Sequence, residues 1–297
     1  MNHEPVMLNE VLDFLESHEH KKILDGTLGL GGYSEAMLKK FPDCFVLGLD
    51  RDEQAINFSR NRLKNFEELS RFQALHKNFS AINEVPEINS FNAYVFDLGV
   101  SNMQLTTPER GFSFQNDGPL DMRMNPNDPN SLTAAEVLKA YNETELAKIF
   151  WEYGEEKFSR QIAAAIKKFK GPLENTSDLV NLIRTTLPQP VQRKMGTHPA
   201  RRIFQALRIF VNDETKELEN LLAALKKISS SKNGALIIFV SYHSIEDRLV
   251  KNFFRSGQAN NLGKILTRHP LTPSENEIEK NYKARSAKLR AFCLSGH

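Results

Sequence analysis

The sequence has few cysteines, no long hydrophobic run and little net charge, and each shortage excludes a class of protein. Cys44 and Cys293 are the two cysteines among 297 residues, so we expect reduced core thiols and neither a disulfide framework nor a metal site. No apolar run approaches the roughly 18 residues that span a bilayer, and the first residues lack the basic start and apolar middle of a signal peptide. We therefore expect a cytoplasmic protein with no membrane partner.

Composition describes an ordinary globular chain. Hydrophobic residues make up 40% and charged residues 26%, which argues against disorder, and the length allows two domains. The formal net charge of +2 is too small to indicate a nucleic-acid-binding protein by itself.

The most informative segment is KILDGTLGLGG, from Lys22 to Gly32, in which a short apolar strand precedes a loop rich in glycine. Glycine reaches positive φ and lets the backbone approach a ligand, and the N–H groups at the start of the next helix point into the same space. The spacing GxxGxGG departs from the GxGxxG pattern of dehydrogenases, and Asp25 stands where dinucleotide folds have glycine. An acid followed by glycines suits a ligand with an amine and no pyrophosphate, which points to S-adenosylmethionine.

A second acid ends the next strand. CFVLGLD closes with Asp50, about 20 residues past the loop, where nucleotide folds place the acid that accepts ribose hydroxyls. The alternative is that Asp25 and Asp50 only cap helices. Two acids at the ends of consecutive strands favour the ligand-binding interpretation.

Strands and helices alternate in the first hundred residues, with strands in KKILDGT, CFVLGLD, RFQALHKNF and NAYVFDLGV, and this alternation predicts a parallel sheet. A Gly/Pro/Asn/Asp-rich connector then leads into helical periodicity from Leu132 to Lys170 and from Ser177 to Leu187, with Thr176 or Ser177 as a cap. One long helix from Pro199 to Lys227, the strand GALIIFVS and a helix opening at Ile245 follow. GKILTRHPL and SAKLRAFCL complete seven strands as an antiparallel addition.

This order predicts an α/β fold of the class I (Rossmann-like) methyltransferase type, with a seven-stranded mostly parallel sheet interrupted by an inserted all-helical domain. We expect the core in residues 1–104 and 198–297 and the insertion in residues 105–197.

Two segments are basic and contain no acid. The first holds Arg193, Lys194, His198, Arg201, Arg202 and Arg208, and the second holds Lys280, Lys283, Arg285, Lys288 and Arg290. A charge run is often only a solvated face, and each segment taken alone fits that interpretation equally well.

Several motifs together resemble the MraW family, the ribosomal small subunit methyltransferases H. They are HEPVMLNEVL, DGTLGLGGYS, FDLGVSNMQL, RGFSF with DGPLDMRM, HPARRIFQALRIFVNDE, SYHSIEDR and KARSAKLR. The resemblance spans nearly the whole chain, and DGPLDMRM is peculiar to that family. It implies S-adenosylmethionine-dependent methylation of N4 of one cytidine in 16S rRNA, position 1402 in the P-site region, with the small ribosomal subunit as partner. A monomer or homodimer is expected.

The resemblance also implies cofactor contacts, which fall on Gly31, Gly32, Tyr33, Asp50, Phe79, Asp97 and Gln104. Asp50 would accept both ribose hydroxyls, and Phe79 would offer an apolar face to the adenine, although core packing is the alternative for this aromatic. Tyr33 stands where the family commonly has histidine, and Asn102 where it has a small residue. A backbone contact at residue 33 survives that change, whereas a side-chain role of histidine does not.

The implied reaction needs hydrogen-bond acceptors, because the lone pair of cytosine N4 is delocalised into the ring. We expect Asp97, or the Leu98 carbonyl, to orient the amine, so Asp97 is the candidate catalytic residue. The base must also be unstacked, at a cost of a few kcal/mol, and His243 and Ser244 could contact it. For His243 the alternative is a helix-start residue satisfied by the backbone.

Phosphate binding is expected from His198, Arg201 and Arg285 in the two basic segments. Three other functions stay open: a small-molecule methyltransferase, an RNA-binding or assembly factor that holds the cofactor without turnover, and a nicotinamide dehydrogenase. The missing GxGxxG spacing argues against the last of these.

Overall fold

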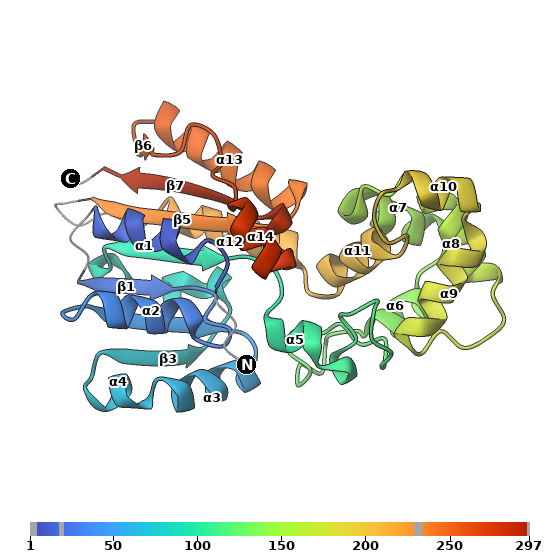
Figure 1. Ribbon diagram of the computed structural model, residues 1–297, viewed down its shortest axis with the longest axis horizontal. Helices are drawn as coiled ribbons and strands as arrows, with labels where there is room; N and C mark the ends of the chain where they lie inside the picture. The colour runs from blue at the N-terminus through green and yellow to red at the C-terminus, as the bar shows by residue number, and fades with distance from the viewer. Residues whose placement is uncertain (1–4, 18–20, 229–233, 296–297) are drawn as a thin grey trace. The chain divides into compact units, whose positions relative to one another are not determined.

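The chain folds into two compact units (Figure 1). The structure is a computed structural model that describes residues 5–17, 21–228 and 234–295, so His3 and Glu4 of the first family motif lie outside the described residues. Unit 1 comprises Met1–Gly99 and Thr215–His297, and unit 2 comprises Val100–Glu214. The insertion expected at 105–197 lies inside unit 2, whose bounds are wider.

Unit 1 is built on a seven-stranded sheet of order β3-β2-β1-β4-β5-β7-β6. Its strands are β1 (Lys22–Asp25), β2 (Phe45–Asp50), β3 (Phe72–His76), β4 (Ala93–Asp97), β5 (Ala235–Ser241), β6 (Gly263–Ile265) and β7 (Lys288–Leu294). The neighbours from β3 to β5 pair in parallel, whereas β7 runs antiparallel to both β5 and β6. The predicted α/β fold class with its mostly parallel sheet is confirmed.

Helices cover both faces of the sheet, which explains why strands such as β5 are apolar along their whole length. One face packs against α1 (Leu8–Glu16), α2 (Gly32–Lys40) and α3 (Glu53–Arg62), and the other against α12 (Glu214–Leu225) and α13 (Ser244–Ala259) (Figure 1). Shorter elements are α4 (Lys64–Glu68), α14 (Glu275–Lys280) and the 3₁₀ helices η1 (Phe79–Glu84), η2 (Ile88–Ser90) and η4 (Tyr282–Ser286).

The connections of this sheet decide where a ligand can bind. β1 lies between β2 and β4, so the chain leaves β1 toward one side and later returns to the other, which makes the carboxyl ends of β1 and β4 the switch point. Parallel α/β sheets bind ligands in the crevice at such a point.

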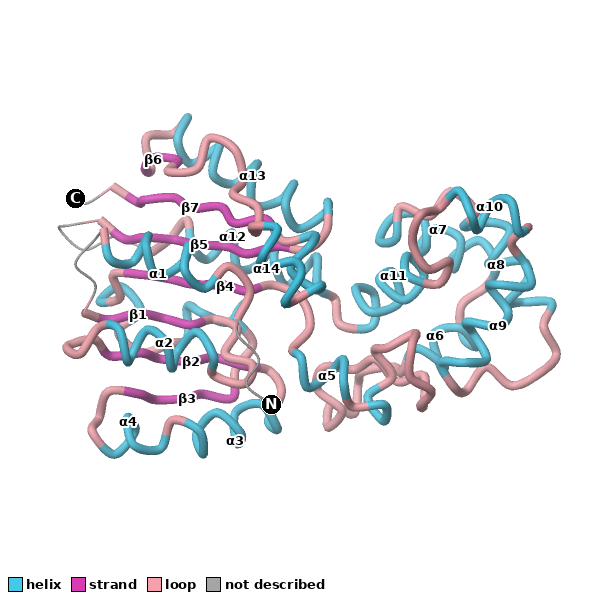
Figure 2. The backbone as a smooth tube through the Cα atoms, viewed as in Figure 1, coloured by secondary structure: helices cyan, strands magenta, loops and turns pink. Residues whose placement is uncertain are grey.

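Unit 2 is helical and has its own core, which includes Phe150, Ile162 and Leu207. Its elements are α5 (Asn102–Thr106), η3 (Pro108–Arg110), α6 (Ala134–Ala140), α7 (Glu143–Gly154), α8 (Ser159–Lys168), α9 (Thr176–Thr186), α10 (Gln189–Lys194) and α11 (Arg201–Val211). Figure 2 shows the chain between η3 and α6 as loop. Asn175 is the N-cap of α9, so the expected cap at Thr176 or Ser177 is wrong by one or two residues.

The single long helix expected from Pro199 to Lys227 is also wrong, because α11 and α12 are separate helices. The side chain of Asn212 accepts a hydrogen bond from the Met124 backbone N–H at 2.7 Å and donates one to the Met122 carbonyl at 2.8 Å. Asp213 then takes a left-handed φ of 50°. Hydrogen bonds to the loop with the sequence DMRM, Asp121–Met124, therefore end α11 at Asn212, although the helical periodicity alone predicts that the helix continues.

The same loop explains two family motifs. Arg110, from RGFSF, donates hydrogen bonds from Nη2 to the carbonyls of Arg123 and Met124 at 3.1 and 2.9 Å. The side chain of Arg110 is buried, so hydrogen bonds in the interior of unit 2 join the motif RGFSF to the motif DGPLDMRM.

Candidate active site

The glycine loop, residues 26–32, follows β1 and turns into α2. Gly29 and Gly31 have φ of 51° and 76°, in the left-handed region that favours glycine, and Gly31 is the N-cap of α2. The carboxyl group of Asp25, at the end of β1, stabilises this turn by accepting two hydrogen bonds. Its Oδ2 accepts from Ser34 Oγ at 2.7 Å and its Oδ1 from the Thr27 backbone N–H at 3.3 Å. Burial raises the pKa of Asp25 to about 6.

Asp50 closes the loop from β2. Its Oδ2 accepts from the Gly29 backbone N–H and its Oδ1 from that of Asp52, each at 2.8 Å. The N-cap of α3 is Asp52, so the alternative in which Asp50 caps this helix is wrong. Burial raises the pKa of Asp50 to about 6. A carboxylate oxygen has two lone pairs, so each oxygen can accept a further hydroxyl donor.

Asp97 ends β4 beside the loop. Its backbone N–H donates to Thr27 Oγ1 at 2.6 Å, and its Oδ1 accepts from the phenol of Tyr242 at 2.7 Å. Burial raises the pKa of Asp97 to about 7, while the bond from Tyr242 opposes the shift and the charges of Asp25 and Glu246 add to it. The carboxyl group is thus poised to ionise near neutral pH.

Gly32 and Tyr33 lie against the N-terminal segment. The buried phenol of Tyr33 donates to the Val6 carbonyl, and a Cβ on Gly32 would lie 2.7 Å from Pro5 Cγ. Because the hydroxyl of Tyr33 is engaged in this way, the backbone of residue 33 is what the site can offer to a ligand.

Phe79 opens η1, just past the end of β3. It is half-buried and meets Phe96 edge to face, with 6.4 Å between the ring centroids. Core packing therefore engages part of this ring and leaves another part exposed.

Gln104 lies in unit 2 and takes part in a capping box at the start of α5. The Ser101 backbone N–H donates to Gln104 Oε1 at 3.0 Å, and the Gln104 backbone N–H donates to Ser101 Oγ at 3.2 Å. Gln104 is buried, and its expected cofactor contact stays a prediction.

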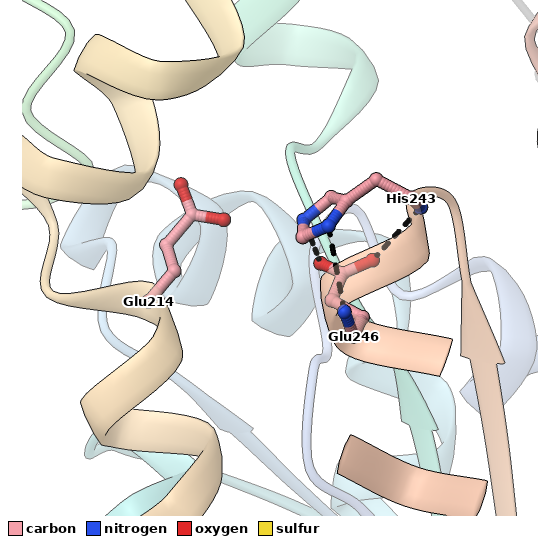
Figure 3. Close-up of side chains that lie close together, drawn as sticks. All are labelled: Glu214, His243 and Glu246. Atoms are coloured by element: carbon pink, nitrogen blue, oxygen red, sulfur yellow. Dashed lines mark hydrogen bonds and ion pairs between the residues drawn. The ribbon is translucent and has the colours of Figure 1, made fainter. Parts of the chain in front are cut away.

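His243 is the N-cap of α13, and Figure 3 shows its ring over Glu246. The Glu246 backbone N–H donates to His243 Nδ1 at 3.4 Å, and the Tyr242 and His243 backbone N–H groups donate to Glu246 Oε2 at 2.9 and 3.4 Å. His243 is therefore a helix-start residue whose ring accepts a backbone hydrogen bond, as the alternative interpretation of this residue expects. Ser244, the first residue of the helix, is exposed, and substrate contact by either residue stays a prediction.

The second basic segment contains two cations that an acid compensates. Lys288 and Arg290 bind Asp247 of α13 at 3.3 and 2.7 Å, so a stretch that lacks acids in sequence gains one by folding. Arg285 is exposed and lies over the ring of Tyr282, 5.7 Å from its centroid. The surface that remains basic here is smaller than the sequence indicates.

The first basic segment lies in unit 2. His198 stacks on Phe114, with 4.7 Å between ring centroids, and burial lowers its pKa. Arg201 is exposed at the start of α11. Arg208 binds Glu214 with two hydrogen bonds of 2.8 Å, so it is already engaged in an ion pair.

Sequence reasoning missed the polar residues that support the acids. They are Thr27, Ser34 and Tyr242, together with Glu246, which accepts from the backbone N–H of Tyr242. One signal was available: His243 followed three residues later by Glu246 has the spacing of a capping box. The contact of Tyr242 with Asp97 joins residues 145 apart in sequence and leaves no local signal.

These residues fit a nucleoside cofactor without a pyrophosphate. Asp50 has acceptor capacity at the end of β2, the loop turns through two left-handed glycines, and Asp97 lies at the switch point. Fold and site together define a class I methyltransferase.

The comparisons with known proteins give the family. The MraW methylase family model matches residues 1–294, and the chain belongs to this family. The chain is accordingly a methyltransferase, and the expected cofactor, S-adenosyl-L-methionine, is that of its family.

Two curated relatives are named ribosomal RNA small subunit methyltransferase H. That of Carboxydothermus hydrogenoformans is 44% identical over 311 residues, covering 98% of this chain and 97% of its own. That of Halothermothrix orenii is 40% identical with the same coverages. Among solved structures, an rRNA methylase from Streptococcus thermophilus aligns with 99% of each chain at 10% identity and a TM-score of 0.43, so the fold assignment depends on the topology above.

No helix in the described part of the chain is long and apolar enough to cross a membrane.

Proposed function

We propose that this protein methylates N4 of one cytidine in 16S rRNA, at the position the family modifies, cytidine 1402. The observation that carries the proposal is the half-buried carboxyl of Asp97 at the end of β4, on the same edge as the glycine loop and Asp50. The relatives, whose names specify ribosomal RNA of the small subunit, support this substrate class.

S-adenosylmethionine, when bound, supplies an electrophilic methyl group on a sulfonium. Asp50 would accept the ribose hydroxyls, Phe79 would offer its exposed ring face to the adenine, and the backbone at Gly31, Gly32 and Tyr33 would contact the methionine part. Gln104 would add a polar contact.

Asp97 acts on the substrate. Its carboxylate, or the Leu98 carbonyl beside it, accepts a hydrogen bond from the cytosine amine and turns the nitrogen lone pair out of conjugation, so that much of the rate comes from alignment. His243 and Ser244 contact the unstacked base, and His198, Arg201 and Arg285 bind phosphates.

The decisive experiment is mass-spectrometric nucleoside analysis of 16S rRNA from cells that lack this protein. We expect N4-methylation to be lost at one cytidine and restored by the wild-type gene. Undiminished modification would reject this substrate. Transfer to small subunits but not to free cytidine, measured with purified enzyme, separates this function from that of a small-molecule methyltransferase, and absence of any turnover would indicate an assembly factor.

A further inference from the structure

Tyr242, which directly follows the neighbouring strand β5, contacts the candidate catalytic carboxylate. Asp97 pairs in register with Val240 of β5, so Tyr242, two residues further on, emerges beside the end of β4. Its hydroxyl donates to Asp97 Oδ1 at 2.7 Å. Within the described residues no hydrogen bond to Asp97 Oδ2 is present, so the lone pairs of this oxygen remain for another donor.

The position of Tyr242 is fixed on two sides. Its backbone N–H donates to Glu246 Oε2 at 2.9 Å, which ties it to the capping box of α13. Its ring packs against Gly99, where a Cβ would lie 3.5 Å from Tyr242 Cδ2 and where φ is +103°.

We propose that Tyr242 is a positioning residue for methyl transfer, whose phenol occupies Oδ1 of Asp97 and leaves Oδ2 directed at the exocyclic amine of the substrate. The inference rests on the proposed function, because that function places the amine at Asp97.

The charges around Asp97 give the phenol a second effect. Asp25 from β1 and Glu246 from α13 raise the pKa of Asp97, the phenol of Tyr33 from α2 also faces it, and the bond from Tyr242 lowers this pKa. Burial and the charge of Asp97 raise the pKa of Tyr242 itself, so it stays a donor. Loss of the phenol therefore favours the protonated carboxyl, which cannot accept from the amine through the protonated oxygen.

The test compares Tyr242→Phe with Tyr94→Phe. Tyr94 lies on β4 and donates its hydroxyl to the Ile88 carbonyl at 2.7 Å, so each variant loses one hydrogen-bonded tyrosine hydroxyl of unit 1. The titration of the Asp97 carboxyl is followed by ¹³C NMR without substrate and assigned with Asp97→Asn. We expect its midpoint to rise by about one pH unit in Tyr242→Phe and to stay in place in Tyr94→Phe.

Turnover gives a second readout. The acid limb of the pH profile for transfer to small subunits should move upward by the same amount in Tyr242→Phe, with kcat about tenfold lower below the midpoint and KM for the cofactor unchanged. An unshifted Asp97 titration in the folded variant overturns the role of Tyr242. Failure of the wild-type enzyme to methylate cytidine instead rejects the proposed function, and the NMR result still stands.

If Tyr242→Phe does not fold, a second substitution at the same position tests the proposal. Incorporation of 3-fluorotyrosine at position 242 keeps the shape and makes the phenol a stronger donor, so the Asp97 titration should move to lower pH. The absence of any movement would again overturn the proposal.

Discussion

At the scale of single residues, the candidate site depends on three carboxyl groups at one edge of the sheet, of which that of Asp25 is buried and those of Asp50 and Asp97 are half-buried. Burial raises the pKa values of Asp25 and Asp50 to about 6 and that of Asp97 to about 7, against 3.8 for an ordinary aspartate. Between pH 3.8 and about 7 the folded chain keeps protons on these carboxyl groups that the unfolded chain has released. The free energy of unfolding therefore falls as the pH rises through this range. The acids are therefore costly to the fold, which is typical of functional sites.

Asp97→Asn should accordingly make the protein more stable and nearly inactive. Above pH 7 the charge of Asp97 is buried at a cost that the amide avoids, so we expect a gain of about 1–3 kcal/mol at pH 8 that shrinks toward pH 4. Urea unfolding at the two pH values measures it. Equal differences at both would contradict the pKa shift of Asp97.

The rate of methyl transfer should depend on the same ionisation. The carboxylate accepts from the amine only when it is deprotonated, so we expect the wild-type rate to fall about tenfold per pH unit below about 7. Single-turnover rates on small subunits, measured between about pH 5 and 9, give the profile. A rate independent of pH through this range would remove Asp97 from the role of acceptor.

The residues that could be predicted are those whose signal is local. Asp50 and Asp97 each follow an apolar run in the sequence, and this local pattern indicates that each acid lies at the end of a strand, on the edge of the sheet. Tyr242 and Thr27 reach Asp97 through strand register, which depends on which strands become neighbours. No spacing rule carries that information.

At the scale of an element, the start of α13 combines a cap with a candidate substrate contact. We expect His243→Ala to cost about 1 kcal/mol because the helix loses its cap, whereas His243→Asn keeps an acceptor and most of the stability. Thermal unfolding of both variants measures this. If the asparagine variant is as stable as wild type but transfers methyl groups slowly, the ring of His243 also serves the substrate; equal destabilisation of both variants would contradict the capping role.

The two basic segments carry less uncompensated positive charge in the fold than in the sequence, because acids from other parts of the chain pair with some of their cations. Arg201 and Arg285 are exposed, and Arg201→Ala or Arg285→Ala should weaken RNA binding and reduce the slope of log K against log[salt] by about one each. Lys64→Ala, an exposed lysine of α4 outside both segments, is the charge-matched control. Unchanged salt slopes, measured by filter binding with 16S rRNA fragments, would remove the phosphate contacts.

At the scale of the whole molecule, unit 2 should fold without unit 1. Its core, from Phe112 to Leu207, is contributed by its own helices and by the loop between η3 and α6. We expect a fragment of residues 100–214 to give a helical circular dichroism spectrum and a cooperative thermal transition. A gradual melt without a transition would show that the unit needs its host.

The order of strands and the presence of a helical insertion could be predicted because alternation and its interruption are visible over tens of residues. The junction could not. Asn212 ends α11 through contacts with Met122 and Met124, some ninety residues earlier, and no local pattern reveals these contacts. For this reason the structure places α11 in unit 2, whereas periodicity joined it to α12.

The place of β7 in the sheet has a consequence for biosynthesis. This strand follows the other six along the chain, yet it lies between β5 and β6, and its seven residues pair with all of β5. Until the nascent chain has cleared the exit tunnel, β5 presents an uncovered strand edge, a template for mispairing, while unit 2 has long been complete. A transcript with a stop codon before β7 therefore yields an aggregation-prone polypeptide and not a shortened enzyme, so the codons of β7 decide whether the whole sheet is completed.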